Sequence, residues 1–472
     1  MSISDRFFRS IFVGIAITAA ASWLWICYCR FPGSPWNDIR LVPVFMAAAG
    51  EPVYSLPGQG ILTTWMYGPV PLWLAWPVTL APNATTAILI AGALNLGLTL
   101  LAIALTCFGW PTAKADQADR WLALAAAIAL WPEPVFRFLQ ADNPAVALGL
   151  ISNLLLITSD KADRSSLRLW LAATAAAAAL GCKQTSLGLP VAQILWLVFE
   201  RGWNVALAHF ARGLIAGILL AAAGILQFGF KALWFGAVTL PSALPLAEEI
   251  GARLRENAPH LALQLGLPPV AIWLVSRVAL PSLTSLRLPI LSWLCALPAG
   301  LLGLLSSGGS HNSLQAFQLF APACFVVLCS QLHLSLGRRL ALATSAIIMT
   351  VIIRILAADT APVRPDTTDL RIATAIQAEL PGQVWLPWNP LVSYYAEHRF
   401  YHAEDGINVR FITGYPVPFA QAQAGLPPRF HAIAVPSPNM QWGPASKLIR
   451  QPASTRHLGN WIVWTWVADS SP

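Results

Sequence analysis

The sequence predicts a polytopic α-helical membrane protein that carries a small α/β domain at its C-terminal end. Of the 472 residues, 56% are hydrophobic and only 11% are charged, whereas soluble domains carry about 25% charged residues. The mean hydropathy is +0.60, and the basic residues are scattered between long apolar blocks, as is typical of membrane proteins. Because the net charge of +8 forms no basic cluster, the composition excludes a nucleic-acid-binding protein, as well as a soluble enzyme and a disordered chain.

A helix that crosses the bilayer needs about 20 mainly apolar residues. The first such block, 11–29, is longer than the core of a signal peptide, and Trp25 and Arg30 stand where a cleavage site would need small residues. We therefore expect this block to remain as a span. Further apolar blocks fall near 84–108, 121–139, 143–159, 169–199, 212–228, 262–280, 288–305, 316–334 and 340–358.

The block 169–199 decides the topology, because it is long for one span and short for two. As a single span it would bury Lys183 near the bilayer centre, which is unfavourable. As a hairpin it would place Lys183 and Gln184 at the tip, and most Lys and Arg residues of the loops would then face inward. We therefore predict about eleven spans, with the N-terminus inside and the C-terminal tail outside.

The first outer loop, residues 30–83, contains two short apolar segments. Residues 37–50 and 69–80 are too short to span and are predicted to be helices lying on the membrane surface. Trp36, Trp65, Trp73 and Trp76 suit that depth, because tryptophan concentrates at the membrane–water interface.

The polar tail after residue 358 reads as a separate small α/β domain. Residues 367–380 have helical spacing, with Thr367 or Thr368 as a possible N-cap. Strand-like runs follow at 383–387, 432–436 and 461–467. The predicted division is therefore a membrane module over 1–358 and an outer domain over 359–472.

Polar residues at the outer ends of spans are the candidates for chemistry, because the sequence contains no nucleotide-binding, zinc-protease or hydrolase motif. We predict no cofactor and no metal site. Asp38 follows the first span and could act as a general base that takes the proton of an acceptor hydroxyl. The simpler alternative is that Asp38 caps the helix that begins beside it.

The remaining candidates would bind substrate on the same outer side. Each has a plain structural alternative: an interfacial anchor, a turn cap, a lysine that extends to water, or a histidine that only packs. A lysine and a histidine gathered there would suit an anionic phosphate. The candidates are Tyr67, Gln140, Asp142, Asn143, Lys183, Gln184, His311 and Asn312.

The order of these features resembles the GT-C superfamily of membrane glycosyltransferases, and most closely glycosyltransferase family 87, the polyprenyl-phosphate-mannose-dependent mannosyltransferases. The resemblance extends over residues 5–335 and depends on the order of short motifs rather than on any one of them. The motifs are WND at 36–38, AAGEPVY at 48–54, YGPVP at 67–71, QADN at 140–143 and GCKQT at 181–185.

The resemblance implies a GT-C-like fold and an inverting transfer of a mannose-like hexose. The donor would be a polyprenyl-phosphate sugar, and the acceptor a hydroxyl of a lipid, glycan or protein on the outer face of a bacterial plasma membrane. It implies that Asp38 is the catalytic base and that Asp142, Asn143 and Lys183 belong to the outer-loop site. Two alternatives remain open: a transporter or lipid flippase, which would place ionisable groups at the midplane, and a scaffold for a partner protein.

Overall fold

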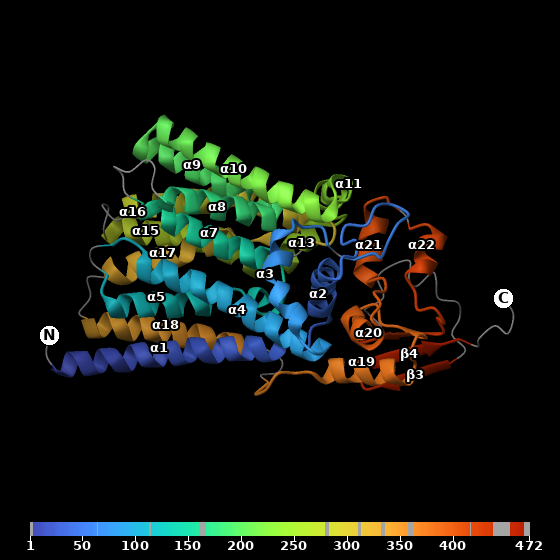
Figure 1. Cartoon of the computed structure of the whole chain (residues 1–472). Coiled ribbons are helices and arrows are strands. Elements are labelled where there is room, and N and C mark those ends of the chain that lie inside the picture. The colour runs from blue at the N-terminus through green and yellow to red at the C-terminus, as the bar shows by residue number, and fades with distance from the viewer. Residues whose placement is uncertain are drawn as a thin grey trace.

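The computed structural model describes residues 3–63, 65–112, 115–159, 167–278, 283–309, 313–331, 336–356, 362–415, 417–437 and 454–466. Within these ranges most of the chain is helical and forms a bundle with a smaller α/β part packed against one end (Figure 1). The N-terminus lies at the opposite end of the bundle.

Long helices run side by side through the bundle. Five stretches among the described residues are long and apolar enough to cross a membrane: Phe7–Arg30, Ala84–Gly109, Trp203–Phe228, Ala258–Arg277 and Leu283–Leu305. The chain is therefore built as an integral membrane protein, while the number of eleven spans stays a prediction. The bundle helices are α1 (Ile3–Arg30), α4 (Ala84–Gly109), α5 (Gln117–Leu130), α7 (Asp142–Ile157), α8 (Leu167–Cys182), α9 (Gly188–Arg201), α10 (Trp203–Phe228), α15 (Leu267–Val278), α16 (Leu283–Leu305), α17 (Ala316–Gln331) and α18 (Leu336–Leu356).

Two of the long helices begin at caps that the sequence supplies: before α4, Asn83 accepts a hydrogen bond from the Thr86 amide at 2.8 Å, and at the start of α5, Asp116 and Asp119 form a capping box. Short helical elements connect the long helices. The connecting elements are α6 (Glu133–Arg137), η2 (Gln184–Leu187), α11 (Phe230–Trp234), the π-helical η3 (Phe235–Thr239) and η4 (Ala262–Gly266), α12 (Leu240–Ser242), α13 (Ile250–Glu256) and α14 (Ala258–Leu261).

The block 169–199 forms two helices and not one. Helix α8 ends at Cys182, Lys183 has an extended backbone, and α9 begins at Gly188 after the single turn of η2. Gly188 allows this turn to press against α16, because a Cβ there would lie 2.2 Å from the Cys295 carbonyl oxygen. Lys183 thus lies at the tip of a hairpin formed by α8 and α9.

The first outer loop folds between the bundle and the C-terminal part. It contains α2 (Pro35–Ala48), α3 (Val70–Leu74) and η1 (Trp76–Leu80). Helix α2 is enclosed by protein, since from Asn37 to Ala47 every residue except Arg40 is buried. The C-terminal part packs beside it (Figure 1). That the loop helices lie at the membrane surface stays a prediction.

The C-terminal part is an α/β unit in which the predicted helix and strands are found. Helix α19 (Thr368–Glu379) is followed by β1 (Val384–Trp385), α20 (Pro390–Glu397), α21 (Glu404–Ile412), α22 (Phe419–Ala424), β2 (Ala432–Val435), β3 (Ser454–Leu458) and β4 (Trp461–Thr465). The sheet has the order β1-β2-β4-β3, with β1 parallel to β2 and the other pairs antiparallel. The expected threonine cap of α19 makes no side-chain bond. Asp366 instead accepts from the Thr368 amide at 3.1 Å.

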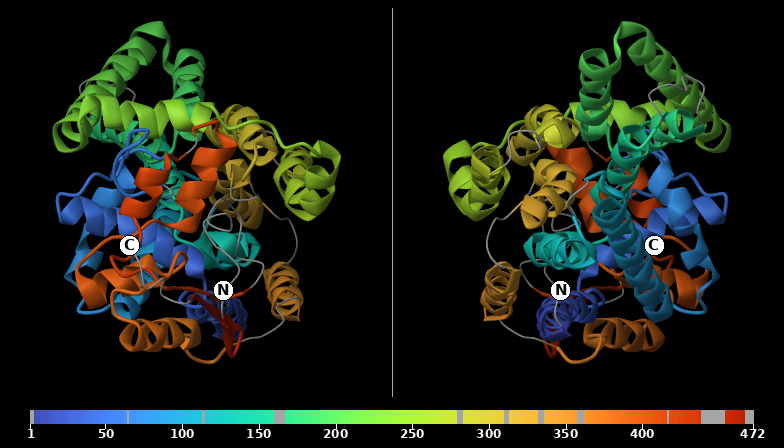
Figure 2. Two further views of the ribbon diagram at one scale, coloured as in Figure 1. Left: turned by 90° about the vertical axis from the view of Figure 1, so that its right-hand side faces the viewer. Right: turned by 90° about the vertical axis from the view of Figure 1, so that its left-hand side faces the viewer.

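The two parts share one core across the first outer loop. Leu62 donates its amide to His402 Nδ1 and accepts from the Ala403 amide, each at 2.9 Å. Ile39 and Leu62 pack in one cluster with Trp385 and Trp388. Figure 2 shows the C-terminal elements lying directly over the loop helices at this end of the bundle. The loop therefore packs against both the membrane bundle and the C-terminal part and connects the two.

Candidate functional site

A buried ion pair lies where the hairpin tip meets the start of α7. Lys183 Nζ is 2.5 Å from Asp142 Oδ1, and the two residues are only 7% and 4% exposed. Asp142 is the first residue of α7, where the helix dipole favours a negative charge, and Lys183 directly follows the end of α8, where it favours a positive one. Each group thereby offsets part of the desolvation of the other.

A second cation completes a cluster around Tyr67. Arg40 Nη1 donates to the Tyr67 hydroxyl at 3.2 Å, and Arg40 Cζ and Lys183 Nζ each lie 5.8 Å from the Tyr67 ring centroid. Burial lowers the pKa of Arg40, but Tyr67, Asp405 and Asp142 raise it by more, so the guanidinium is held charged. Two positive side chains therefore flank one tyrosine.

Two glycines bring Tyr67 next to the hairpin tip. A Cβ on Gly68 would lie 2.0 Å from the Gly181 carbonyl oxygen, and one on Gly181 would lie 2.8 Å from Val70 Cγ2. A Cβ essentially never approaches a backbone atom so closely, so only glycine fits at position 68. This contact packs the start of α3 against the end of α8. It thereby places Tyr67 beside Lys183.

Asn37 positions the segment that leads into α7. Its Oδ1 accepts from the Leu139 amide at 2.7 Å, and its Nδ2 donates to the carbonyl oxygens of Phe31 and Arg137 at 2.6 and 3.0 Å. Asn143 also holds this turn, since its Nδ2 donates to Asn95 Oδ1 at 2.8 Å. The sequence predicts that Asn143 binds substrate, and in the structure its side-chain amide stabilises the turn that leads into α7.

An apolar cavity of about 300 Å³ opens beside this cluster. It lies between α2, α3, η1, α4 and the turn before α7, and its apolar lining includes Val44, Trp65, Leu74, Val78, Leu94 and Leu98. Arg40, Asn95 and Gln140 supply its polar groups. The buried Oε1 of Gln140 has no hydrogen-bond partner among the described residues, so it is available to a ligand donor. The cavity suits a long apolar group with a polar or anionic head.

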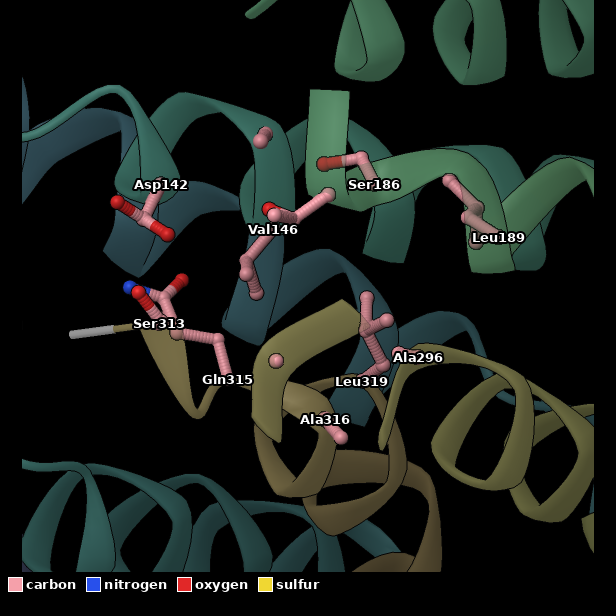
Figure 3. A pocket seen from close by; sticks show the side chains of 12 residues that line it. Asp142, Val146, Ser186, Leu189, Ala296, Ser313, Gln315, Ala316 and Leu319 are labelled. Carbon is pink, nitrogen blue, oxygen red and sulfur yellow. The ribbon is translucent and has the colours of Figure 1, made fainter. Parts of the chain in front are cut away.

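A small cavity of about 40 Å³ lies against Asp142 and is lined by residues before α17 and after α8. Figure 3 shows Ser313 and Gln315 beneath Asp142, with Leu189 and Leu319 at the apolar end. Gln315 is 7% exposed, and neither its amide oxygen nor its nitrogen has a partner within the described ranges. The volume has room for about three water molecules.

Gln184 is turned away from the ion pair. Its Nε2 donates to the Met66 carbonyl oxygen at 3.2 Å and also to that of Ala237. This amide ties the hairpin tip to the first loop and to η3. The geometry therefore gives no support to the predicted contact of Gln184 with substrate. It does support a contribution of Gln184 to the shape of the site.

Asp38 does not face the cluster, which corrects the expected orientation of the proposed base. It is fully buried, and its carboxyl accepts from the Leu391 amide at 2.8 Å and lies 3.4 Å from Asn389 Nδ2. It thus caps α20 of the C-terminal part and not its own helix. Burial raises the pKa of Asp38 to about 8, against the lowering effect of these bonds.

His311 and Asn312 lie outside the described residues, so their predicted roles stay predictions. Sequence reasoning missed Arg40 and Gln315. Arg40 belongs to the same short motif as Asp38, but nothing in the sequence says which of them faces the cavity. Within the described ranges, no group of three or more His, Cys, Asp and Glu side chains is arranged to hold a metal ion.

Comparison with known proteins shows the fold. No protein-family model matches the sequence, and no curated protein matches it either. The crystal structure of ArnT from Cupriavidus metallidurans bound to undecaprenyl phosphate superposes with a TM-score of 0.59 at 14% identity, over 98% of both chains. Its apo form gives 0.58 at 13% identity over the same shares. The structure of arabinosyltransferase EmbB from Mycobacterium smegmatis gives 0.37 at 14% identity, over 77% of this chain and 42% of that one.

The likeness to ArnT extends over nearly the whole chain, including the C-terminal part. The likeness therefore shows the fold. The assignment to the GT-C superfamily, and to glycosyltransferase family 87 within it, stays a prediction. The chain is thus an integral membrane protein with the fold of ArnT.

Proposed function

We propose that the chain is a membrane glycosyltransferase that takes a sugar from a polyprenyl-phosphate donor. The observation that carries the proposal is the cluster of Arg40, Tyr67, Lys183 and Asp142, in which Arg40 also lines an apolar cavity. The fold of ArnT, which was crystallised with undecaprenyl phosphate, supports the same donor class. The sugar is a mannose-like hexose and the acceptor a hydroxyl of a lipid, glycan or protein, on the outer face of a bacterial plasma membrane.

The two cations suit the phosphate of such a donor. Lys183 and Arg40 flank Tyr67 from two sides, and Lys183 is buried while Arg40 is partly buried. When the bond between the sugar and the phosphate breaks, negative charge grows on the leaving phosphate. Fixed cations in a medium of low polarity stabilise the more highly charged leaving phosphate more than they stabilise the singly charged phosphodiester of the bound donor. The isoprenoid chain of the donor would occupy the apolar cavity.

A carboxylate is needed for the acceptor, and Asp142 is placed to supply it. In a single inverting displacement the acceptor oxygen bonds to the anomeric carbon, and the electron pair of the old bond leaves with the phosphate. The acceptor proton passes to Asp142 as Lys183 turns toward the phosphate. The sequence favours Asp38 as the general base. Because the Asp38 carboxyl caps α20, we propose Asp142 for this role. The mechanism needs no cofactor, because the donor itself is activated.

Binding of the donor lipid tests the site without knowledge of the acceptor. We expect undecaprenyl phosphate to raise the melting temperature of the purified protein in detergent, and uncharged undecaprenol to raise it less, because the cations recognise the phosphate. Lys183→Gln should abolish the difference between the two lipids. Lys231→Gln, which removes an exposed lysine of α11, is the matched control and should leave it unchanged.

Two outcomes would contradict the proposal. One is equal stabilisation of the wild-type protein by undecaprenyl phosphate and undecaprenol. The other is an undiminished phosphate-dependent shift in Lys183→Gln and in Arg40→Gln, since the cluster offers the donor these two cations. In that case the ion pair would only support the fold.

A further inference from the structure

A large groove lies between the C-terminal part and the end of the first outer-loop helix. Its volume is about 620 Å³, twice that of the apolar cavity, and its lining is mixed polar and apolar. We call it the outer groove. It is lined by Glu51 of the first loop, by Tyr394, Arg399 and Phe400 around the end of α20, and by Gln423 and Pro427 around the end of α22.

Aromatic rings form one wall of the outer groove. Tyr394 and Phe400 stack with their ring centroids 4.4 Å apart and their planes 10° from parallel, and His398 stands edge-on to Tyr394 at 6.2 Å. Flat aromatic walls of this kind provide broad, rigid contact area with little loss of conformational freedom on binding. They match ligands that have a flat apolar face.

The polar lining contains every type of hydrogen-bonding group within one groove. Glu51 provides a carboxylate acceptor, Arg399 a planar set of donors, and Gln423 an amide that both donates and accepts. All three side chains are exposed in the free protein. Pyranose sugars have this double character, since a ring of hydroxyl groups surrounds an apolar face. A lipid chain would leave these polar groups without partners.

Hydrogen bonds hold α20 and the turn after it in place beside the outer groove. Glu397 accepts from the Tyr401 hydroxyl at 2.5 Å and from the Gly382 amide at 2.6 Å, which fixes the turn after α20. His398 in that turn has φ +54°, the one positive φ of a residue other than glycine in the described part of the chain. Tyr395 also fastens α20 to the first loop, because its hydroxyl donates to the Ala81 carbonyl oxygen at 2.7 Å.

The outer groove and the apolar cavity lie on two sides of one helix. Phe45 of α2 packs on Tyr394 with ring centroids 5.6 Å apart, while the preceding residue, Val44, lines the apolar cavity. We propose that the outer groove binds a carbohydrate chain, and that this chain is the acceptor or the part of it next to the reacting hydroxyl. The acceptor role rests on the proposed function, whereas carbohydrate binding stands without it.

Saturation-transfer NMR on the full-length protein in detergent tests the groove directly, with mannotetraose as the probe and tetra-alanine as the peptide comparison. We expect transfer to mannotetraose and none to the peptide. Phe400→Ala and Arg399→Ala should each weaken binding by about three- to tenfold. Phe411→Ala removes an exposed ring of α21 outside the groove and should bind like the wild-type protein.

The outcomes separate the groove from the transferase proposal. Two outcomes would overturn the carbohydrate-binding proposal. One is that mannotetraose binds Arg399→Ala and a folded Phe400→Ala as tightly as the wild-type protein. The other is a response to tetra-alanine as strong as the response to the sugar. Sugar transfer that remains intact in that case leaves the proposed function standing. Carbohydrate binding in a protein that transfers no sugar would support the groove and contradict the proposed function.

Discussion

Asp38 gives the sharpest contrast between a catalytic and a structural role. Its carboxyl accepts from the Leu391 amide at 2.8 Å inside the junction of α2 and α20, and no part of the residue reaches solvent. The neighbouring Asn389 Oδ1 is buried and has no partner among the described residues. A rotated Asn389 amide would therefore accept the proton of a neutral Asp38, since amide orientations are inferred from such networks. Asp38→Asn mimics that protonated carboxyl, whereas Asp38→Ala removes it.

The expected stability losses differ between the two variants. Asn keeps an oxygen for the Leu391 amide, so Asp38→Asn should lose less than about 1 kcal/mol. Ala leaves a buried N–H at the first turn of α20 unpaired, which should cost about 1–3 kcal/mol. Because the folded-state pKa is raised from 3.8 to about 8, the contribution of Asp38 is complete below the unfolded value and is lost as the pH rises through about 8. Asp38→Asn should abolish that decline.

Melting temperature and sugar transfer measured on the same preparations decide the matter. A capping role predicts near-normal melting and near-normal transfer for Asp38→Asn, and a lower melting temperature for Asp38→Ala. A general base predicts a transfer rate about 10²–10⁴-fold lower for Asp38→Asn. An Asp38→Asn protein that melts like the wild type but loses transfer on that scale would refute the capping interpretation and restore the role that the sequence favours.

Three further predictions concern the construction of the site. Gly68→Ala should lower the melting temperature because its Cβ would lie 2.0 Å from the Gly181 carbonyl oxygen, whereas Gly97→Ala, with no atom within 4 Å of the added carbon, should not; equal melting would contradict the close contact. Lys183→Met should lose about 3–5 kcal/mol by removing the cation that lies 2.5 Å from the buried Asp142 carboxylate, and adding Asp142→Leu should recover part of it; additive losses would argue against a coupled pair. Burial lowers the pKa of His402, so its contribution should be complete above pH 6.5 and decline below it; a His402→Gln variant with the same acid sensitivity in melting would contradict this origin.

Much of the fold is predictable because it follows from periodicity and charge. The spans appear as apolar blocks, and the placement of Lys and Arg in the loops indicates a hairpin with Lys183 at its tip, as the structure shows. Helix α19 and strands β1, β2 and β4 also lie within the predicted segments. Strand β3 (Ser454–Leu458) was not predicted, because its first four residues are polar and exposed and the strand lacks an alternating apolar pattern.

The orientation of α2 was not predictable, and the site depends on it. Asp38 and Arg40 are two residues apart, so they point to opposite sides of a helix. Sequence alone cannot say which side meets the cavity, because the C-terminal part buries the other side equally well. Helices α20–α22, which cause this burial, are only 8, 9 and 6 residues long and therefore give weak periodic signals.

Sugar transfer by the reconstituted protein tests the central claim most directly. Proteoliposomes would receive polyprenyl-phosphate mannose labelled in the sugar, together with a bacterial membrane extract as the source of acceptor. The wild-type protein and Lys231→Gln should transfer label to the acceptor, and Lys183→Gln should do so at least about 10²-fold more slowly, because the leaving phosphate loses a fixed cation. A folded Lys183→Gln protein that transfers label at the wild-type rate would contradict the claim.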